Sequence, residues 1–360
     1  MKQTLVIAEA GVNHNGSLEM AFKLVDAAVD AGADIVKFQT FKAKNLVTAA
    51  AGKAQYQIET TGNKESQLAM LTRLELSYDA HHQLLEYCAL KNIEFLSTAF
   101  DSESLAFLVN DIKVKRLKIP SGELTNSPFV LDHARSGLDI ILSTGMATLE
   151  EVKNALSVIA FGYVSPLDMP PSLANFELAF SSDEGQKALS SKVTILHCTT
   201  EYPAPFEEVN LNVMDTLKRS FGLPVGYSDH TQGIAIPIAA VAKEAVVIEK
   251  HFTLDCSLPG PDHLASIEPL QLKVMVESIR HVEQALGHGI KKPSLSEVKN
   301  IPIARKSIVA QTDIKQGEPF NVRNLTIKRP GTGMSPDLFW QLTSGQVASK
   351  SYLAGDLIDE

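Results

Sequence analysis

The chain has 360 residues, which is enough for a barrel of about 250 residues together with a modest accessory unit. Its composition, 44% hydrophobic and 21% charged, is typical of a folded globular protein and excludes disorder over most of the length. The formal net charge of −9 argues against nucleic acid or an acidic membrane as a partner, because both require a basic face.

From the amino terminus onward, apolar β-rich runs alternate with segments of helical spacing. The run 4–13 precedes a helical segment, 17–32, that begins at a serine cap and ends at a glycine. Eight such repeats predict an α/β fold, a (β/α)8 TIM barrel. An open doubly wound sheet is the alternative, but eight near-regular repeats exceed what such sheets usually need. The later pairs are 33–41 with 77–92, 93–100 with 101–112, 114–122 with 127–137, 139–147 with 148–162, 192–203 with 211–222, 223–231 with 233–245, and 246–254 with 269–287.

Two insertions, 42–76 and 163–190, interrupt these repeats. The first leaves the expected active rim and should cover substrate, whereas the second enters its strand from the opposite face and should be structural. After the barrel at 1–286, a polar, proline-containing stretch at 287–303 indicates a linker. Short β-like pieces between Gly and Pro turns predict a small, mostly β domain at 304–360. So short a unit buries little core, so it should lean on another surface.

The cysteines and the amino terminus bear on the compartment. Cys88, Cys198 and Cys256 form no CxxC pair and cannot all pair internally, which favours a reducing environment. The first apolar run reaches Glu9 too soon for a signal-peptide core, and no run of about 18 apolar residues occurs. We therefore expect a cytoplasmic protein that does not enter a membrane.

Each predicted strand ends in a polar or ionisable residue. Because the carboxyl ends of parallel barrel strands meet at one rim, these residues should be neighbours. Such a rim suits an anionic, phosphorylated substrate and a divalent metal. In chain order the residues are Glu9, Lys37 with Gln39, Thr98, Lys118 with Ser121, Ser143, Thr199, Asp229 with His230, and Lys250 with His251.

Two histidines are the candidate metal ligands. His230 and His251 end the seventh and eighth strands, which are adjacent in a barrel, so both imidazoles should reach one ion. Two hydrogen-bonded structural histidines are the alternative. With two protein ligands, water and substrate oxygens would complete the shell, and the ion would act as a Lewis acid on a carbonyl. Mn²⁺ or Mg²⁺ is the expected ion.

Three lysines are the candidate anion-binding groups. Lys37, Lys118 and Lys250 each lie in an apolar context, where an unpaired ammonium is costly, so an anion is the expected partner. Hydroxyl and backbone donors at Ser121 and Ser143, near helix starts, are typical of phosphate binding. A solvated charge is the alternative for each lysine.

Glu9 and Asp262 are the candidate carboxylates. Burial in an apolar strand would raise the pKa of Glu9 unless a cation pairs with it, and either outcome suits acid–base work or holding water. A structural ion pair with a lysine is the alternative. Asp262 lies on a loop stiffened by Pro and Gly and could accept protons from sugar hydroxyls, unless it is merely a turn-forming aspartate.

The motifs at these positions resemble those of the sialic acid synthases, which join phosphoenolpyruvate to an N-acylated mannosamine. They run in order through nearly the whole chain as IAEAGVNHNGS, VKFQT, STAF, KIPSGE, STGM, HCTTEYPAP, GYSDHT, EKHFT, PGPDH and IKRPGTG. The resemblance implies a barrel followed by an antifreeze-like (SAF) domain. It also implies a domain-swapped homodimer in which the small domain caps the partner's barrel.

The resemblance also implies roles for individual residues. His230 and His251 match the metal ligands, and Glu9 matches the carboxylate near the reacting carbons. Arg329 matches an arginine that reaches across the dimer to the acetamido group. The phosphoenolpyruvate set is Lys37, Lys118, Ser121 and Ser143 with Gln39 and Thr98 beside them, and the other substrate-binding positions are Asn63, Glu123, Tyr202 and Asp262.

The implied reaction begins with attack of the enolpyruvate methylene carbon on the aldehyde of the open-chain amino sugar. Water then adds, with Glu9 positioning it or moving its proton, and phosphate leaves by C–O cleavage. No Schiff base is required, in contrast to a lysine aldolase. The competing class is a non-catalytic barrel that binds phosphosugars, which the retained glutamate, histidines and lysines argue against.

One position bears on the choice of acceptor. Synthases that make N-acetylneuraminate typically have an asparagine two positions before the motif tyrosine, where this chain has Thr200. The run EYPAPFEEVNL is more similar to the branch that makes N,N'-diacetyllegionaminate from a 2,4-diacetamido-trideoxymannose. Loss of an amide beside a sugar hydroxyl is compatible with a deoxygenated, acylated acceptor. N-acetylmannosamine is the alternative acceptor.

Overall fold

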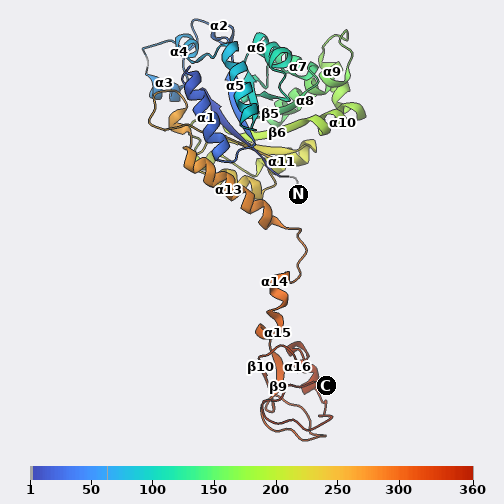
Figure 1. The fold of residues 1–360 in the computed structure, drawn as a ribbon. Coiled ribbons are helices and arrows are strands. Elements are labelled where there is room, and N and C mark those ends of the chain that lie inside the picture. Colours follow the sequence, from blue (N-terminus) through green and yellow to red (C-terminus); the bar gives the residue numbers. More distant parts are fainter. Residues whose placement is uncertain (1–2, 63, 360) are drawn as a thin grey trace. The chain divides into compact units, whose positions relative to one another are not determined.

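The computed structural model describes residues 3–62 and 64–359, which form two compact units, 1–287 and 288–360. Within those described ranges, no helix combines the length and the apolarity needed to span a membrane. The first unit contains the predicted repeats of strand and helix (Figure 1).

Eight strands of the first unit form one barrel-like sheet in which every pairing is parallel. Their order is β3-β2-β1-β8-β7-β6-β5-β4, and the two ends, β3 and β4, lie against each other. The repeats therefore close as the sequence predicts. The strands are β1 (Leu5–Gly11), β2 (Ile35–Thr40), β3 (Glu94–Ala99), β4 (Arg116–Ile119), β5 (Asp139–Ser143), β6 (Val193–Cys198), β7 (Val225–Asp229) and β8 (Val247–His251).

Helices surround this sheet, and their apolar faces pack on the outward side chains of the strands (Figure 1). Capping groups begin several of them: Thr148 and Glu151 form a reciprocal capping box on α8, which satisfies two otherwise free N–H groups. The helices of the repeats are α1 (Leu18–Asp30), α5 (Tyr78–Leu90), α6 (Ser102–Phe107), α7 (Ser127–Arg135), α8 (Leu149–Val164), α11 (Val213–Phe221), α12 (Ala235–Ala242) and α13 (Pro269–Leu286).

The interior of the barrel is filled in layers. Successive strand side chains point to opposite faces, so alternate residues of each strand face the barrel axis. An apolar layer of inward residues closes the interior. Two positions further along several of these strands, the next inward residues are polar and line the cavity described below. The apolar layer consists of Ile7, Ile35, Leu96, Ile141, Leu196 and Val247.

The two insertions form short helices. The first contains α2 (Ala43–Leu46), α3 (Gln55–Thr61) and α4 (Gln67–Leu74), and residues from it line the cavity, as expected for a segment that covers substrate. The second contains α9 (Leu173–Ser181) and α10 (Asp183–Lys192), which pack against α8.

The second unit has its own small core and little regular structure. Strands β9 (Ser307–Ala310) and β10 (Leu325–Lys328) form an antiparallel pair. The segment expected as a linker contains two four-residue helices, α14 (Leu295–Val298) and α15 (Ile301–Ala304), and α16 (Phe339–Thr343) lies further on. The core consists of Ile308, Ala310, Ile314, Phe320, Leu325, Leu342, Ala348, Tyr352 and Ile358.

Candidate functional site

A cavity of about 380 Å³ lies at the carboxyl ends of the barrel strands. The side chains that line it come from all parts of the first unit, so the folding of the barrel gathers residues far apart in the sequence. Asn63 lies outside the described residues, and Arg329 belongs to the second unit. The cavity is lined by the following predicted site residues: Glu9, Lys37, Gln39, Thr98, Lys118, Ser121, Glu123, Ser143, Tyr202, His230, His251 and Asp262.

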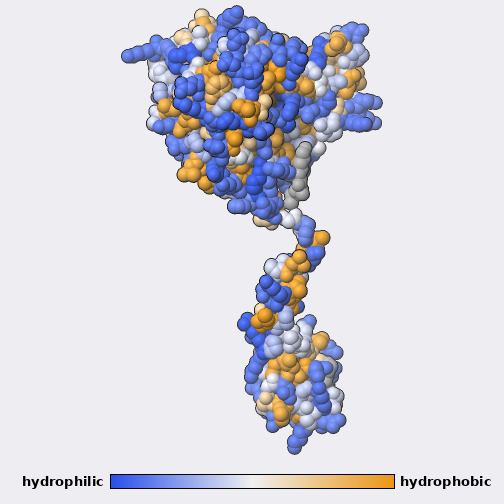
Figure 2. Space-filling view, in the orientation of Figure 1, coloured by the Kyte–Doolittle hydropathy of each residue, from blue (hydrophilic) through white to orange (hydrophobic). Residues whose placement is uncertain are grey.

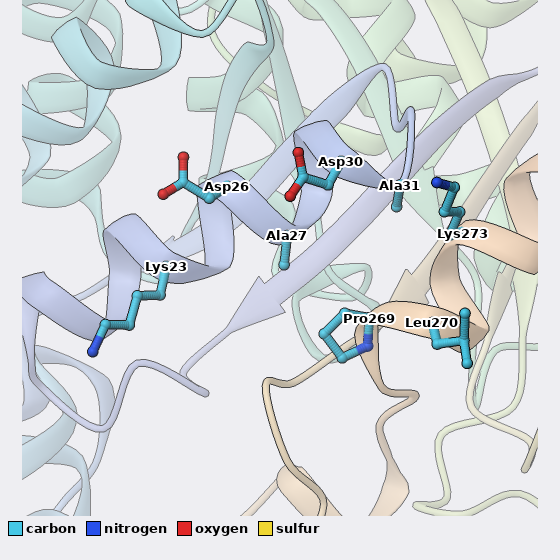
Figure 3. A pocket seen from close by; sticks show the side chains of 8 residues that line it. All are labelled: Lys23, Asp26, Ala27, Asp30, Ala31, Pro269, Leu270 and Lys273. Carbon is cyan, nitrogen blue, oxygen red and sulfur yellow. The ribbon is translucent and has the colours of Figure 1, made fainter.

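Another hollow, of about 520 Å³, lies between α1 and α13 on the outside of the barrel (Figure 3). Lys23, Asp26, Asp30 and Lys273 surround it together with small and apolar side chains. These charges belong to surface helices, and Lys23 already pairs with Glu19 at 2.8 Å. The strand-end cavity, which holds buried and unusually paired charges, is therefore the candidate site.

Four buried charges form the floor of this site. Lys37 Nζ lies 2.7 Å from Glu9 Oε2 and 3.5 Å from Glu249 Oε2. Lys118 Nζ lies 3.4 Å from Glu249 Oε1. Lys37 also donates to Thr98 Oγ1 at 3.0 Å. Two carboxylates thus balance two ammonium groups in a place where a single unpaired charge would be very costly.

The two carboxylates have opposite pKa shifts. Burial raises the pKa of Glu9 to about 7, against the attraction of Lys37 and with a further contribution from the charge on Glu249. Burial also opposes ionisation of Glu249, but the ammonium groups of Lys118 and Lys37 outweigh it and lower the pKa of Glu249. Glu249 is therefore charged at neutral pH, whereas Glu9 can take up or release a proton there.

The sequence did not predict Glu249 as a site residue. The prediction that Lys250 binds an anion at the rim of strand ends was wrong. Lys250 is fully buried outside the cavity lining, 2.6 Å from Asp229 Oδ2. Side chains alternate along β8, so Glu249 and His251 face the cavity and Lys250 points to the helical layer. The apolar context of Lys250 indicated burial correctly, but its partner is a carboxylate of this chain.

Hydroxyl and backbone donors gather beside Lys118. Ser121 Oγ accepts a hydrogen bond from the Gly145 N–H at 3.0 Å and lies 3.1 Å from Cys198 Sγ. A Cβ on residue 145 would lie 2.8 Å from Ser121 Oγ and would collide with Thr200, so a larger residue there would displace these hydroxyl groups. The buried Ser143 hydroxyl has no hydrogen-bond partner among the described residues. Such donors next to an ammonium group suit a phosphate.

The two candidate metal ligands lie side by side. The His230 and His251 ring centroids are 5.5 Å apart. Burial lowers the pKa of both imidazoles, so both are neutral, as metal ligation requires. His230 Nδ1 lies 2.6 Å from the Thr199 carbonyl oxygen, which leaves its other nitrogen as a potential ligand. Asp262 Oδ2 lies 3.9 Å from His251 Nδ1, an atom that is buried without a hydrogen-bond partner.

The residues present fit a divalent ion held by two imidazoles, with the carboxylate of Asp262 nearby. Within the part of the chain that the structure describes, no group of three or more His, Cys, Asp and Glu side chains is placed to hold a metal by itself. Water or substrate oxygens would have to complete the coordination. This is an open arrangement, which suits a metal that contacts substrate.

Aromatic rings continue from the histidines towards the first insertion. The Tyr202 ring lies 4.2 Å from His230 and 5.5 Å from His251. On its other side, the Tyr56 ring of α3 lies 5.1 Å from Tyr202.

Burial raises the pKa of Asp262 to about 6, so this carboxyl group can hold a proton at mildly acidic pH.

Comparisons with known proteins show which proteins this chain resembles. The NeuB family model matches residues 24–291. The chain is 51% identical over 360 residues, the whole of both chains, to N,N'-diacetyllegionaminic acid synthase of Campylobacter jejuni. It is 47% identical to the enzyme of the same name from Legionella pneumophila, over 92% of this chain and 86% of that one.

Among solved structures, the N-acetylneuraminic acid synthetase of Leptospira borgpetersenii, in complex with citrate, superposes with a TM-score of 0.66 at 33% identity. The match covers 83% of this chain and 90% of that one. The family model matches more than half of the chain, and both relatives cover at least 92% of it. The chain therefore belongs to the NeuB family.

Proposed function

We propose that this protein condenses phosphoenolpyruvate with 2,4-diacetamido-2,4,6-trideoxymannose and water, forming N,N'-diacetyllegionaminate and phosphate. The observation that carries the proposal is a single cavity in which Lys37 and Lys118 lie beside two carboxylates and two neutral imidazoles. The choice of acceptor is supported by the names of the relatives that are 51% and 47% identical.

The donor binds, on this proposal, at the lysines and the nearby hydroxyl groups. Phosphoenolpyruvate carries a phosphate and a carboxylate, and the ammonium groups of Lys37 and Lys118 would neutralise them. The hydroxyl groups of Ser121 and Ser143 would donate to phosphate oxygens, with Thr98 holding Lys37 in place at 3.0 Å. Because the site is buried, these contacts are stronger than they would be in water.

His230 and His251 would hold the metal, Mn²⁺ or Mg²⁺, which when bound would polarise the aldehyde oxygen of the acceptor. The support is their neutral state and the 5.5 Å between their rings. The acceptor would bind on the side of these histidines where Tyr202 and Asp262 lie, with Asn63 and Glu123 as further contacts. Gln39 would lie beside the donor.

The chemistry joins two carbons, adds water and releases phosphate. The methylene carbon of phosphoenolpyruvate forms a bond to the aldehyde carbon, the aldehyde oxygen takes up a proton to become a hydroxyl group, and positive charge develops on the carbon that carries phosphate. Water adds to that carbon as Glu9, whose pKa is raised to about 7, accepts its proton. The tetrahedral intermediate then breaks its C–O bond to phosphate and becomes a ketone, its remaining hydroxyl proton leaves with the phosphate, and the lysines stabilise the departing anion.

We propose further that residues 304–360 form an SAF domain and that two chains form a domain-swapped homodimer in the cytoplasm. In that dimer Arg329 would reach the acceptor bound in the partner's barrel. Two observations on the second unit support the proposal. Arg329 is exposed, and Trp340 is 73% exposed. Hydrophobic residues, coloured orange, also lie on the surface of this unit (Figure 2). Such side chains favour burial in an interface.

The test is incubation of the purified protein with phosphoenolpyruvate, Mn²⁺ and each candidate sugar, followed by mass analysis of the product. We expect a nine-carbon keto acid with two acetamido groups and one equivalent of phosphate, both abolished by a chelator. Product from N-acetylmannosamine alone would refute the acceptor assignment. Binding of phosphoenolpyruvate without turnover would instead support a non-catalytic barrel, and trapping of substrate on Lys118 by borohydride would support a lysine aldolase.

A further inference from the structure

The first insertion places a small hydrophobic cluster against the cavity. This cluster joins residues of α2 and α4 to barrel residues next to β1, β2 and β3, and every member also lines the cavity. The insertion is therefore fixed to the barrel by burial of apolar surface, and the side of the cavity that it forms is apolar. The members are Val12, Phe41, Met70 and Leu74, with Leu46, Leu71 and Phe100 packed against them.

Five side chains of the insertion, which we call the insertion wall, are available to a ligand in the cavity. They line the cavity and are neither fully buried nor fully exposed. A ligand can therefore remove them from water. The insertion wall consists of Leu46, Val47, Tyr56, Gln67 and Leu71; a sixth such side chain, Gln57, lies beside it and donates from its amide to the Tyr56 hydroxyl.

The insertion wall lies on the acceptor side of the site. Its Tyr56 ring is 5.1 Å from Tyr202, which in turn is 4.2 Å from His230. Tyr56 is also close enough to Asp262 for the carboxylate to affect its ionisation. Because C1 of the acceptor must react beside the histidines, its C4 and C6 groups would extend towards this wall.

Two polar groups interrupt the apolar surface of the insertion wall. Burial and the charge of Asp262 raise the pKa of Tyr56, so its phenol keeps a proton to donate. That phenol oxygen accepts from Gln57 Nε2 at 3.4 Å. Among the described residues, none forms a hydrogen bond with the side-chain amide of Gln67. One donor and one amide beside several methyl groups match the polarity of an acetamido group.

This polarity distinguishes the two candidate acceptors. N-acetylmannosamine has hydroxyl groups on C4 and C6, whereas the 2,4-diacetamido-2,4,6-trideoxy sugar has an acetamido group and a methyl group there. Leucine and valine side chains cannot pair with a C6 hydroxyl, which would lose its hydrogen bonds to water on binding. A methyl group in the same place gains from burial.

We propose that the insertion wall is the specificity subsite that selects a 4-acetamido-6-deoxy acceptor. Leu46, Val47 and Leu71 receive the C6 methyl and the acetamido methyl. Tyr56 and Gln67 bind the carbonyl and N–H of the 4-acetamido group. This inference rests on the proposed function, because it assigns substituents of the acceptor named there.

The test compares the two acceptors in Val47→Ala and Leu71→Ala, with phosphoenolpyruvate saturating. For the 2,4-diacetamido sugar, kcat/KM should fall by about tenfold in each variant, the effect expected for loss of methyl contacts in a pocket. For N-acetylmannosamine, kcat/KM should change by less than about twofold in either variant. The loss should appear in KM rather than kcat, because the contacts are remote from the reacting carbons and equal in ground and transition states.

Leu68→Ala is the matched control, since Leu68 is a partly buried leucine of the same helix that does not line the cavity. It should alter neither acceptor's kcat/KM. Val47 is the C-cap residue of α2, so Val47→Ala should leave the helices intact. It therefore keeps the test valid even if Leu71→Ala fails to fold. Equal losses for both acceptors, or the same loss in Leu68→Ala, would overturn the inference. A wild-type protein that condenses neither sugar would overturn the proposed function itself.

Discussion

At the scale of single residues, the site depends on four charges that neutralise one another. Glu9 and Glu249 share Lys37, and Glu249 alone contacts Lys118. The carboxylates favour the charged form of both lysines: they outweigh burial and raise the pKa of Lys37, whereas burial still lowers the pKa of Lys118. The arrangement also separates the acidities of the two carboxylates, so that Glu249 remains an anion while Glu9 exchanges a proton near neutral pH.

The first prediction concerns pH. A general base works only when deprotonated, and burial raises the pKa of Glu9 to about 7. The value of kcat/KM, which reports on the free enzyme, should therefore rise as the pH increases through about 7 and fall below it. Glu9→Gln should lower kcat by on the order of 10²- to 10⁴-fold and remove this limb of the profile. If the fall in kcat/KM below pH 7 persists in Glu9→Gln, the titrating group is a residue other than Glu9.

The second prediction follows from the coupling between the two carboxylates. The negative charge of Glu249 raises the pKa of Glu9, so Glu249→Gln should move the acidic limb of the kcat/KM profile to lower pH. Glu94→Gln is the control, because Glu94 pairs with Arg116 at 2.8 Å at the start of β3, away from the cavity. An unchanged limb in Glu249→Gln, or an equal shift in the control, would show that the carboxylates are not coupled in this way.

At the scale of elements, the alternation of side chains on β8 decides which groups meet substrate. Val247, Glu249 and His251 face the barrel axis, and Lys250 faces the helices, where it forms an ion pair with Asp229. Asp229 also accepts from the Thr231 backbone N–H at 3.1 Å. Lys250 therefore stabilises the fold between β7 and β8, with no contact to the cavity.

The third prediction is a matter of stability. Lys250→Met leaves Asp229 buried without its counter-ion, which should lower the free energy of unfolding by about 3–5 kcal/mol in urea titrations. The double variant Asp229→Asn/Lys250→Met leaves no unpaired charge and should recover most of that loss. The kcat of folded Lys250→Met should remain close to wild type. Loss of activity without loss of stability would instead place Lys250 in the site.

The elements of the barrel could be predicted because each repeat carries a local signal: an apolar run followed by helical spacing and a cap. The residues of the site could be predicted in most cases because barrel geometry brings strand ends together. Glu249 was missed because it stands next to Lys250, so a local charge pair explained its place in an apolar strand. It lies two residues before His251, however, and residues two apart on a strand point to the same face, so this spacing could have placed Glu249 on the inner face. The helices of the insertions, with weak periodicity, gave no such signal.

At the scale of the whole molecule, a second unit with a small core accompanies the barrel. The fourth prediction tests its proposed part in catalysis. If Arg329 contacts the acceptor in a partner's barrel, Arg329→Ala should raise KM for the sugar by roughly tenfold, the cost of one charged contact, with little change in KM for phosphoenolpyruvate. Arg323→Ala, at another exposed arginine of this unit, should change neither. Equal losses for both substrates would contradict the bridging role.

The sequence alone could suggest that role only by resemblance. Arg329 Nε donates to the Ala304 carbonyl oxygen, in the same unit, at 3.1 Å. A contact across a dimer leaves no periodicity or spacing in the sequence of one chain. The acceptor is also harder to predict than the donor, because on the proposed function charges would bind the donor and the shape of the cavity would select the acceptor.

The central claim, that the strand-end charges catalyse condensation with C–O cleavage, is tested most directly with phosphoenolpyruvate labelled with ¹⁸O in the bridging position. On incubation with the protein, Mn²⁺ and the 2,4-diacetamido sugar, the released phosphate should carry the label, as measured by mass spectrometry. Unlabelled phosphate, with the bridging oxygen left on the organic product, would show P–O cleavage and contradict the account.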